Sequence, residues 1–410
     1  MIFYSVSQVL IHENRLHSWP ASAEIETAER KEEVEELWER LLHVWRVNHL
    51  PIEVRHCLHL VTLSSLQLIP GSHAGFYCCF SSLILSSTLH CSSAMAKAVP
   101  RTVLITGCSS GIGLCMAVQL ARDPERRFHV IATMRDLRKK DKLEAAAGNT
   151  LNQTLTIQRL DVCSDESVAE CINSLPDKQL DVLVNNAGVG LIGPLESISI
   201  DAMKHIFETN FFGAIRMIKA VLPAMKQRQR GHIVVISSVM GLQGVPFNDV
   251  YAASKFAIEG FCESLAVQLL KFNIFISMIE PGPINTEFEM KLMEEVAKSQ
   301  FPGVDATTVH CFKDIYLPAS HEIFTTMGQS PESVAKTVVN VIAKERPPFR
   351  TQTNLLYTPL VALKYADTSG DLSVGTYYNL LFRFTRLFYI STSFLKCLTC
   401  RCFRRQITPT

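Results

Sequence analysis

The amino-acid sequence predicts an α/β fold built on a doubly wound parallel sheet, and two observations lead to this prediction. From Thr102 to about Lys344, short runs rich in Val, Ile and Leu alternate with longer segments of helical period, which is the pattern of a parallel sheet covered by helices. Several of these runs, such as 232–236, are almost continuously apolar, as expected for strands buried on both faces. We therefore expect a single large domain with terminal extensions.

The individual elements follow from the same alternation along the chain. The apolar runs predict strands at 102–106, 128–133, 155–160, 180–184, 231–237 and 273–279. The segments of helical period predict helices at about 111–122, 164–174, 201–227, 250–271 and 331–344. Glycine-rich or polar motifs stand directly after the first four strands. Because open α/β sheets bind ligands at the carboxyl ends of their strands, these motifs are candidates for a binding site.

Three regions are expected in the 410 residues: an N-terminal extension over 1–94, a main domain over 95–360 and a tail over 361–410. The extension has a charged helical stretch at 25–48 and no Asp, Glu, Lys or Arg between 56 and 96. We expect it to be poorly ordered rather than a docked subdomain. Neither a secretory signal nor a membrane-spanning helix is predicted there.

The composition narrows the classes of partner. A formal net charge of +1 gives the chain no bulk attraction to nucleic acid, so no nucleic-acid partner is expected. The cysteines of the main domain have no paired spacing typical of a disulfide scaffold, which predicts a reduced, cytosolic protein. No array of the CxxC…CxxC type occurs, and no metal site is expected.

A glycine-rich turn follows the first expected strand. Gly107, Gly111 and Gly113 lack Cβ atoms, which lets the backbone turn sharply and approach a phosphate. The helix that begins near Gly111 would direct its free N–H groups and its positive dipole end at that anion. The turn predicts a dinucleotide site, with a tight strand-to-helix connection as the simpler alternative; the site would also include Ser109, Ser110 and Ile112.

The residue after the second strand predicts which dinucleotide is bound. An acidic residue there would accept hydrogen bonds from the ribose hydroxyls of NAD, whereas this chain has Arg135. A guanidinium offers a fork of donors to a 2′-phosphate, so we expect NADP(H), with Ser110 as a second candidate phosphate contact. The alternative is a surface pair of Arg135 with Asp136 that contributes little.

Two further motifs stand at carboxyl ends of strands. Asp161 follows the third strand and would accept a hydrogen bond from the adenine amino group. After the fourth strand, Asn186, Ala187 and Gly188 form a small-residue turn that would let the chain pass close to the cofactor. Taken alone, either motif is equally a helix cap or a turn. Together with the glycine turn they predict one cofactor site.

The segment Tyr251-Ala-Ala-Ser-Lys255 predicts acid–base chemistry. On a helix, residues four apart share a face, so the Lys255 ammonium would lie beside the Tyr251 phenol and lower its pKa. Ser238 stands thirteen residues upstream. The alternatives are a buried hydrogen-bonded tyrosine, a surface lysine and a capping serine, but their combination at these spacings favours a site of hydride transfer.

These motifs, together with Asn210 and Pro281-Gly282, resemble the short-chain dehydrogenase/reductase family, and the resemblance covers about 100–350. It implies a Rossmann-type fold, a homodimer and the following roles. Tyr251 would give or take the proton at the substrate oxygen, Ser238 would hydrogen-bond that oxygen, and Lys255 would hold the nicotinamide ribose. Asn210 would position a water in the proton relay. The cofactor would also contact Pro281, Gly282, Ile284 and Thr286, the last two at the nicotinamide carboxamide.

The substrate is expected to be a small apolar carbonyl or alcohol. The segment Thr286–Met327 is long and rich in Phe and Met, which favours a mobile lid over such a substrate, with ordinary packing as the alternative. Several motifs resemble those of the branch of the family that acts on retinoids and estrogenic steroids. Within this branch the chain resembles the retinol enzymes most. Ala319 stands about where the steroid enzymes place a histidine. The resemblance implies reduction of all-trans-retinal to all-trans-retinol, with 17β-hydroxysteroid dehydrogenase activity and a non-catalytic NADP-binding scaffold as alternatives.

The C-terminal tail predicts contact with a membrane. From Leu381 to Arg405 it is apolar and aromatic, with six basic residues and no acidic one, which suits an interface with anionic lipid. Its cysteines Cys397, Cys400 and Cys402 are candidates for S-acylation, as the resemblance implies. A metal knuckle and a basic disordered tail are the alternatives. The expected location is the cytosolic face of a membrane, which by resemblance is the photoreceptor outer segment.

Overall fold

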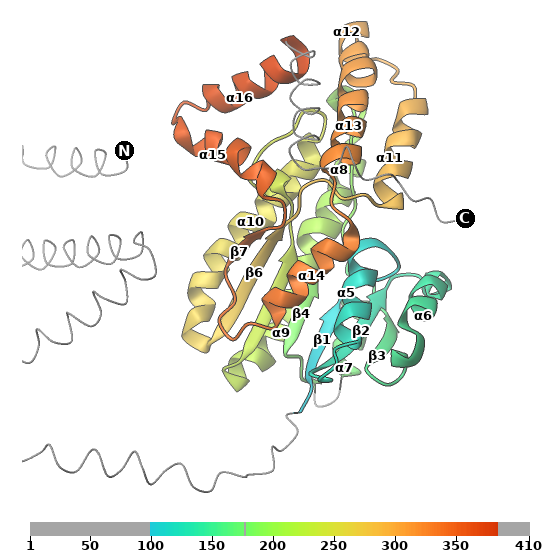
Figure 1. The fold of residues 1–410 in the computed structure, drawn as a ribbon, viewed down its shortest axis with the longest axis vertical. Coiled ribbons are helices and arrows are strands. Elements are labelled where there is room, and N and C mark those ends of the chain that lie inside the picture. The colour runs from blue at the N-terminus through green and yellow to red at the C-terminus, as the bar shows by residue number, and fades with distance from the viewer. Residues whose placement is uncertain (1–98, 176–177, 384–410) are drawn as a thin grey trace, which may run out of the picture. The chain divides into compact units, whose positions relative to one another are not determined.

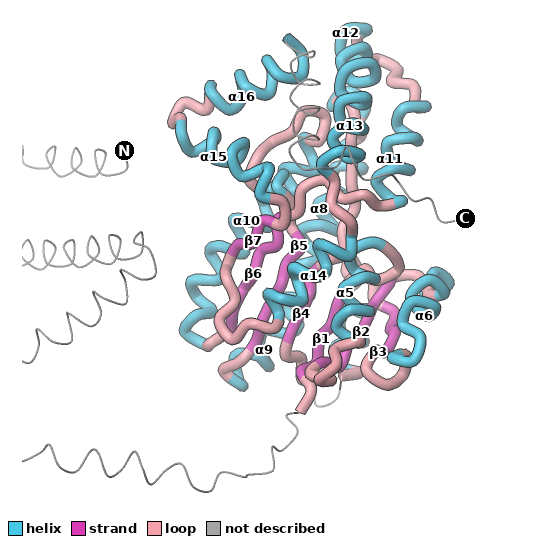
Figure 2. Tube along the Cα trace, viewed as in Figure 1, coloured by secondary structure: helices cyan, strands magenta, loops and turns pink. Residues whose placement is uncertain are grey.

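A computed structural model of the chain describes residues 99–383, except 176 and 177. Its centre is a seven-stranded sheet in which every neighbouring pair of strands is parallel, in the order β3-β2-β1-β4-β5-β6-β7 (Figures 1 and 2). The strands are β1 (Arg101–Ile105), β2 (Phe128–Met134), β3 (Leu155–Arg159), β4 (Val182–Asn185), β5 (Gly231–Ile236), β6 (Ile274–Glu280) and β7 (Arg350–Gln352). The order reverses between β1 and β4, which is where doubly wound folds bind their ligands.

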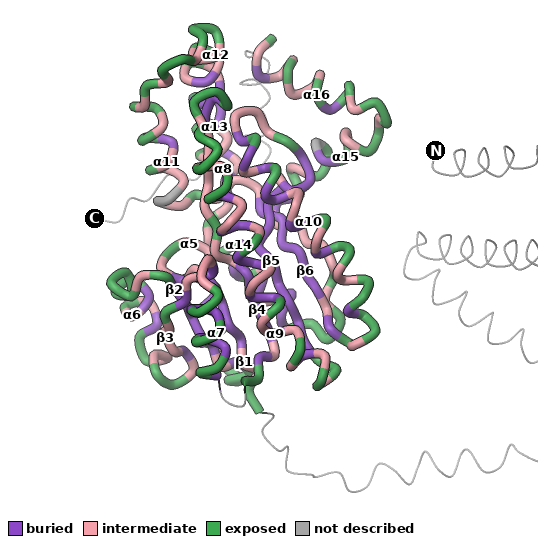
Figure 3. Tube along the Cα trace, turned by 180° about the vertical axis from the view of Figure 1, so that it is seen from behind, coloured by how far each residue is buried: buried purple, intermediate pink, exposed green. Residues whose placement is uncertain are grey.

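Helices cover both faces of the sheet, as the predicted fold class requires. The strand residues alternate between two apolar layers: Val103 and Ile105 of β1 face one layer, and Leu104 faces the other. The first layer contains α5 (Gly111–Ala121), α6 (Asp141–Ala147) and α14 (Pro331–Ile342). The second contains α7 (Asp165–Asn173), α9 (Ala214–Arg228) and α10 (Asp249–Leu269). Figure 3 shows the sheet strands buried between these layers.

The six strands predicted from the sequence are confirmed to within about two residues, whereas the seventh strand was not predicted. β7 has three residues and the sequence Arg350-Thr-Gln352, so it has no apolar run to mark it. The predicted helix 201–227 is instead α8 (Ile200–Phe207), a π-helical turn (Glu208–Gly213) and α9. Short 3-10 turns lie at Leu137–Lys139, Gly148–Thr150, Leu195–Ser197, Val239–Gly241, Leu270–Phe272 and Leu355–Tyr357.

The segment predicted as a lid is helical and lies beyond the carboxyl ends of the strands (Figure 1). It contains α11 (Glu287–Lys298), α12 (Ala306–His310), a π-helical turn (Cys311–Tyr316) and α13 (Leu317–Met327). Its aromatic side chains pack together: Phe312 is fully buried and contacts Phe247, Phe301 and Tyr316. Ordinary packing therefore accounts for part of its Phe content.

After the last strand the described chain ends in α15 (Thr358–Ala366), α16 (Asp371–Tyr378) and a π-helical turn (Asn379–Arg383). None of the helices in the described part of the chain is both long enough and apolar enough to cross a bilayer. The extension over 1–94 and the tail cysteines lie outside the described residues, so the predicted boundaries and the predicted acylation sites stay predictions.

Candidate active site

The loops after β1 and β4 are bound to each other at the point where the strand order reverses. The buried Thr106 hydroxyl accepts hydrogen bonds from the backbone N–H groups of Asn186 and Ala187, each at 2.9 Å. In return, Asn186 Nδ2 donates to the Thr106 carbonyl at 2.8 Å and to the Gly107 carbonyl at 3.1 Å. The structure thus brings the two predicted cofactor motifs together, and it gives Asn186 a role in holding the glycine turn.

The glycines of this turn are required by close approach and by backbone conformation. A Cβ on Gly113 would lie 2.3 Å from the Gly107 carbonyl oxygen and 2.5 Å from Asn186 Nδ2. Gly107 and Gly111 have φ of +74° and +59°, a region that favours glycine. Helix α5 begins directly behind them with Ser110 as its N-cap residue, and its first turn has no acidic side chain. The turn therefore fits the phosphates of a dinucleotide.

The end of β2 lies next to the glycine turn. The Cys108 N–H donates to the Thr133 carbonyl at 2.8 Å, and Thr133 Oγ1 donates to the Ile105 carbonyl at 2.9 Å. Arg135 follows two residues later and is exposed. The alternative role for Arg135 was a surface ion pair with Asp136. The Asp136 carboxylate instead binds Arg138, at 2.9 Å. Arg138 lowers the pKa of that carboxyl to about 2.

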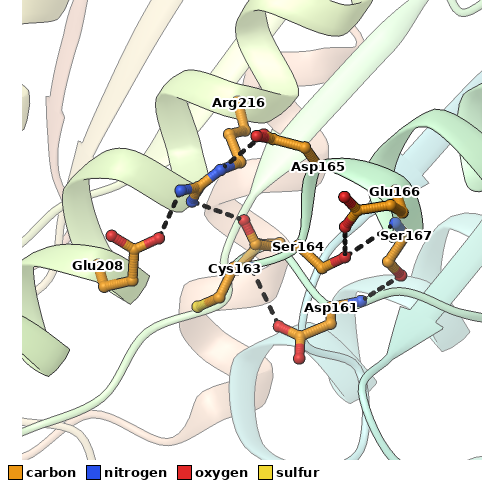
Figure 4. A network of polar contacts seen from close by, with 9 residues as sticks. Asp161, Cys163, Ser164, Asp165, Glu166, Ser167, Glu208 and Arg216 are labelled. Atoms are coloured by element: carbon orange, nitrogen blue, oxygen red, sulfur yellow. Dashed lines mark hydrogen bonds and ion pairs between the residues drawn. The ribbon is translucent and has the colours of Figure 1, made fainter.

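The loop after β3 is organised by Asp161 and its neighbours (Figure 4). One Asp161 carboxylate oxygen accepts from the Cys163 N–H at 3.0 Å, so this side chain makes the turn considered as its alternative role. Arg216 at the start of α9 joins this loop to the π-helical turn: it binds Asp165 at 2.9 Å and the Val162 carbonyl at 3.2 Å, and it also pairs with Glu208.

The predicted catalytic residues come together at the carboxyl ends of β4 and β5. Tyr251 and Lys255 lie one turn apart on α10, with the Lys255 ammonium 5.6 Å from the centre of the Tyr251 ring. Ser238 follows β5 and hydrogen-bonds the Tyr251 phenol. Lys255 Nζ donates to the Ile236 carbonyl at 3.0 Å. A Cβ on Gly188 would lie 3.9 Å from that nitrogen, so the Gly188 turn borders the same site.

The pKa of Tyr251 differs from the expectation that Lys255 would lower it. Burial raises the pKa of Tyr251 above its ordinary value, the carboxyl of Glu289 raises it further, and only the Ser238 hydrogen bond opposes them. Burial also lowers the pKa of Lys255 to about 8, although the nearby Glu259 acts in the opposite direction. The phenol is thus held in its protonated form, the form that carries the proton to be donated, although a raised pKa also makes it a weaker acid.

Asn210 lies in the π-helical turn and makes contacts that the sequence did not reveal. Its carbonyl oxygen accepts from the Val189 N–H at 2.8 Å, and its Nδ2 donates to the Val189 carbonyl at 2.9 Å and to Ser254 Oγ at 3.1 Å. Ser254 Oγ donates to the Tyr251 carbonyl at 2.7 Å. The Asn210 side chain therefore connects the loop after β4 to helix α10, which carries Tyr251 and Lys255. This positioning role is additional to the predicted role of holding a water in the proton relay.

The loop from Pro281 to Thr286 contacts the turn after β5 and approaches the glycine turn after β1. The Pro281 carbonyl accepts from the Val239 N–H at 2.9 Å, next to Ser238. A Cβ on Gly282 would lie 2.9 Å from the Tyr357 ring, and Ile284 pairs with Gln329 in an isolated bridge. Thr286 Oγ1 accepts from the Glu289 N–H at 3.2 Å and caps α11. The Thr286 methyl would be 3.7 Å from a Cβ on Gly111, so this loop reaches the glycine turn.

Several polar residues of the lid were not predicted as site residues. Glu289 and Tyr316 belong to the lid, and Asn248, directly before α10, donates from Nδ2 to the Tyr316 hydroxyl at 2.6 Å. Burial raises the pKa of Tyr251 and of Tyr316, and Glu289 raises both further. The sequence signal for Glu289 was Thr286-x-x-Glu289, which marks a helix start. Ala319, singled out by resemblance, is buried against Leu381 of the last described turn.

Fold and site together define an oxidoreductase that uses a nicotinamide dinucleotide and acts on an alcohol or carbonyl group. The sequence profile of the family described as short chain dehydrogenase matches residues 101–297. Retinol dehydrogenase 8 of Bos taurus is 64% identical over 310 residues, which cover 76% of this chain and 98% of that protein. The chain belongs to the short-chain dehydrogenase/reductase family.

Two further similarities bear on the branch and the cofactor. 17-beta-hydroxysteroid dehydrogenase type 1 of Homo sapiens is 44% identical over 281 residues, which cover 68% of this chain and 84% of that protein. The solved structure of ElxO with NADP bound has a TM-score of 0.51 and 27% identity, and the match covers 63% of this chain and 99% of that one.

Proposed function

We propose that this protein reduces all-trans-retinal to all-trans-retinol with NADPH, at the cytosolic face of a membrane. The observation that carries the choice of substrate is the 64% identity to a retinol dehydrogenase over 98% of that protein's length. The reductive direction requires Tyr251 to carry its proton, and burial, which raises the pKa of this phenol, keeps the proton on it at neutral pH.

The residues present fit the cofactor, and each has a defined task. The glycine turn and the start of α5 would hold its phosphates, Arg135 its 2′-phosphate, and Lys255 its nicotinamide ribose. When bound, the nicotinamide supplies the hydride that reduces the carbonyl carbon. Ser238 donates a hydrogen bond to the substrate oxygen and orients it. Tyr251 then gives its proton to that oxygen, and Lys255 stabilises the phenolate that remains.

The steroid alternative is favoured by one specific observation. This observation is the 44% identity to 17-beta-hydroxysteroid dehydrogenase type 1 over 84% of that protein's length. Steady-state rates of the detergent-solubilised protein with all-trans-retinal and with estrone, each with NADPH and NADH, distinguish the two. We expect the highest kcat/KM for retinal with NADPH. A higher kcat/KM for estrone would overturn the proposed substrate.

The cofactor preference is tested by Arg135→Ala. A charge-assisted contact to phosphate contributes about 1.5–3 kcal/mol, so the KM for NADPH is expected to rise about tenfold or more while the KM for NADH changes little. Arg138→Ala is the matched control, because this exposed arginine lies three residues on and binds Asp136. An equal loss with both cofactors would mean that Arg135 has a structural role.

Membrane association is tested by replacing Cys397, Cys400 and Cys402 with serine. Several acyl chains, or one chain with a basic patch, give stable anchoring, whereas a single chain gives marginal residence. We expect the triple variant to move from the membrane pellet to the soluble fraction and to keep its detergent-solubilised retinal reduction. If the variant remains in the pellet, acylation is not the anchor and another part of the chain holds the protein there.

A further inference from the structure

An ionic cluster with two buried carboxylates lies next to the catalytic residues, and the proposed chemistry does not use it. Arg350 at the start of β7 is its centre. This guanidinium donates to Glu259 of α10 at 2.5 Å, to Glu280 at the end of β6 at 2.7 Å, and to Glu263 of α10 at 2.8 Å. The Glu259 and Glu280 side chains are only 5% and 1% exposed, whereas Glu263 is 66% exposed at the rim.

The cluster adjoins the catalytic site through Gly241. A Cβ on Gly241 would lie 2.8 Å from Ser237 Oγ, 2.9 Å from Glu259 Cγ and 3.2 Å from the Lys255 carbonyl oxygen. Gly241 ends the short turn that begins after Ser238, and this turn packs on α10. The stem of Glu259 therefore lies directly beneath the loop that carries the catalytic serine.

Acidic side chains outnumber the cation in the cluster, because three carboxylates bind the one guanidinium of Arg350. Two buried carboxylates, Glu259 and Glu280, share a single guanidinium, and burying an excess charge is costly. Lys255 is a second buried cation, one helical turn before Glu259 on the same face of α10. Lys255 thus adds a second cation on the helix face of Glu259, and Glu263 at the rim is the third acid of the cluster. Tyr251, Lys255, Glu259 and Glu263 thus form a stripe of four-residue spacing along α10.

The groups that face Lys255 come from several elements. From α10 these are Tyr251, which is neutral, and Glu259, whose charge raises the pKa of Lys255 against burial. Burial raises the pKa of Glu259 and Glu280 raises it further, whereas the Ser237 hydrogen bond and Arg350 lower it. Cys262 beside Glu259 is a neutral thiol because burial raises its pKa to about 12. Glu289 of α11 acts on Tyr251. Glu259 is therefore the one acid that supports the Lys255 charge among the groups of the described chain that act on its pKa.

We propose that Glu259 is a positioning residue that keeps Lys255 in its ammonium form, and that Arg350 keeps Glu259 ionised for this task. The proposal rests on the cofactor-binding role proposed above for Lys255. Without the Glu259 charge, burial would leave Lys255 neutral at lower pH, and a neutral amine neither binds the ribose hydroxyls as strongly nor stabilises the phenolate.

Glu259→Gln tests the proposal, with Glu263→Gln as its matched control. Both variants lose one carboxylate that binds Arg350, but only Glu259 acts on Lys255. NADPH affinity by fluorescence and kcat/KM for retinal are measured from pH 6 to 10. For Glu259→Gln we expect the alkaline loss of both quantities to move to lower pH by about 1 unit or more, since an opposite charge at short range shifts a pKa by this amount. Glu263→Gln and the charge-conserving Glu259→Asp should follow the wild type.

An unshifted profile for Glu259→Gln, or an equal shift in Glu263→Gln or Glu259→Asp, would overturn the proposal. If Glu259→Gln does not fold, Arg350→Gln replaces it. Loss of the guanidinium lets Glu259 take up a proton, so the alkaline loss of NADPH affinity and of kcat/KM should again move to lower pH. An unmoved midpoint of this pH profile overturns the proposal. The binding measurement needs no retinal. If the protein does not reduce retinal but Glu259→Gln still shifts the pH midpoint of NADPH binding, the proposed substrate is refuted and the role of Glu259 stands.

Discussion

Tyr251→Phe is expected to abolish turnover while the affinity for NADPH stays within a few-fold of the wild type. The change removes the hydroxyl that donates the proton to the substrate oxygen and leaves the ring that packs beside Lys255. A positioned general acid contributes about 10²–10⁴-fold to the rate, so kcat should fall by at least this factor. Steady-state rates with retinal and a fluorescence titration with NADPH measure the two quantities.

The matched control for this substitution is Tyr365→Phe. Tyr365 lies on α15 and is 70% exposed. Its substitution removes the same hydroxyl group at a position away from the catalytic residues. We expect wild-type rates for it. If Tyr251→Phe kept a tenth or more of the wild-type kcat, another group would have to supply the proton, and the assignment of Tyr251 as the acid would be wrong.

The sequence predicted the parts of the site that depend on local spacing. The strand that ends at Ile105, the glycines after it and the Tyr251-Lys255 pair were all recognisable, because strand period, turn chemistry and helix period act over a few residues. The structure adds why these motifs meet. The carboxyl ends of adjacent parallel strands lie together, and the Thr106 hydroxyl joins the loop after β1 to the loop after β4.

What the sequence could not predict depends on contacts between distant segments. Glu259 has the ordinary look of a helix-surface acid, and only β7 brings Arg350 to it, 91 residues further along the chain. Glu289 was hidden for the same reason, because the fold of α11 decides that it faces Tyr251. The raised pKa of Tyr251 follows from burial, which spacing alone does not reveal. These long-range effects set the protonation states, whereas local motifs only named the candidate groups.

The stripe of four-residue spacing on α10 contains both the pair recognisable from local spacing and the acid that a distant strand binds. Tyr251 and Lys255 are the groups expected to touch substrate and cofactor, and Glu259 continues the same face into the protein interior. The helix therefore carries both the reacting pair and the charge that we propose controls it. Because α10 packs on β6 and on the turn after β5, the pair is held by the sheet itself.

The glycine turn yields the second large expected effect, through Gly113→Ala. Alanine in place of glycine inside a helix ordinarily stabilises it by about 1 kcal/mol. Here the added Cβ would lie 2.3 Å from the Gly107 carbonyl oxygen, so the turn must move. We expect overpacking to cost about 1–3 kcal/mol, with a lower Tm. Since the displaced backbone is the one expected to face the phosphates, and a hydrogen bond to a charged group contributes about 1.5–3 kcal/mol, the affinity for NADPH should fall about tenfold or more.

Gly260→Ala separates this close contact from the general effect of alanine. Gly260 is also a helical glycine, but it is exposed on α10, and an added Cβ there meets nothing within 4 Å. We therefore expect Gly260→Ala to keep NADPH binding and to raise the Tm slightly, whereas Gly113→Ala lowers both. Thermal unfolding and fluorescence titration of the two variants measure this difference. Wild-type Tm and affinity in Gly113→Ala would mean that α5 does not pack closely on the turn, and the phosphate site would then have to lie elsewhere.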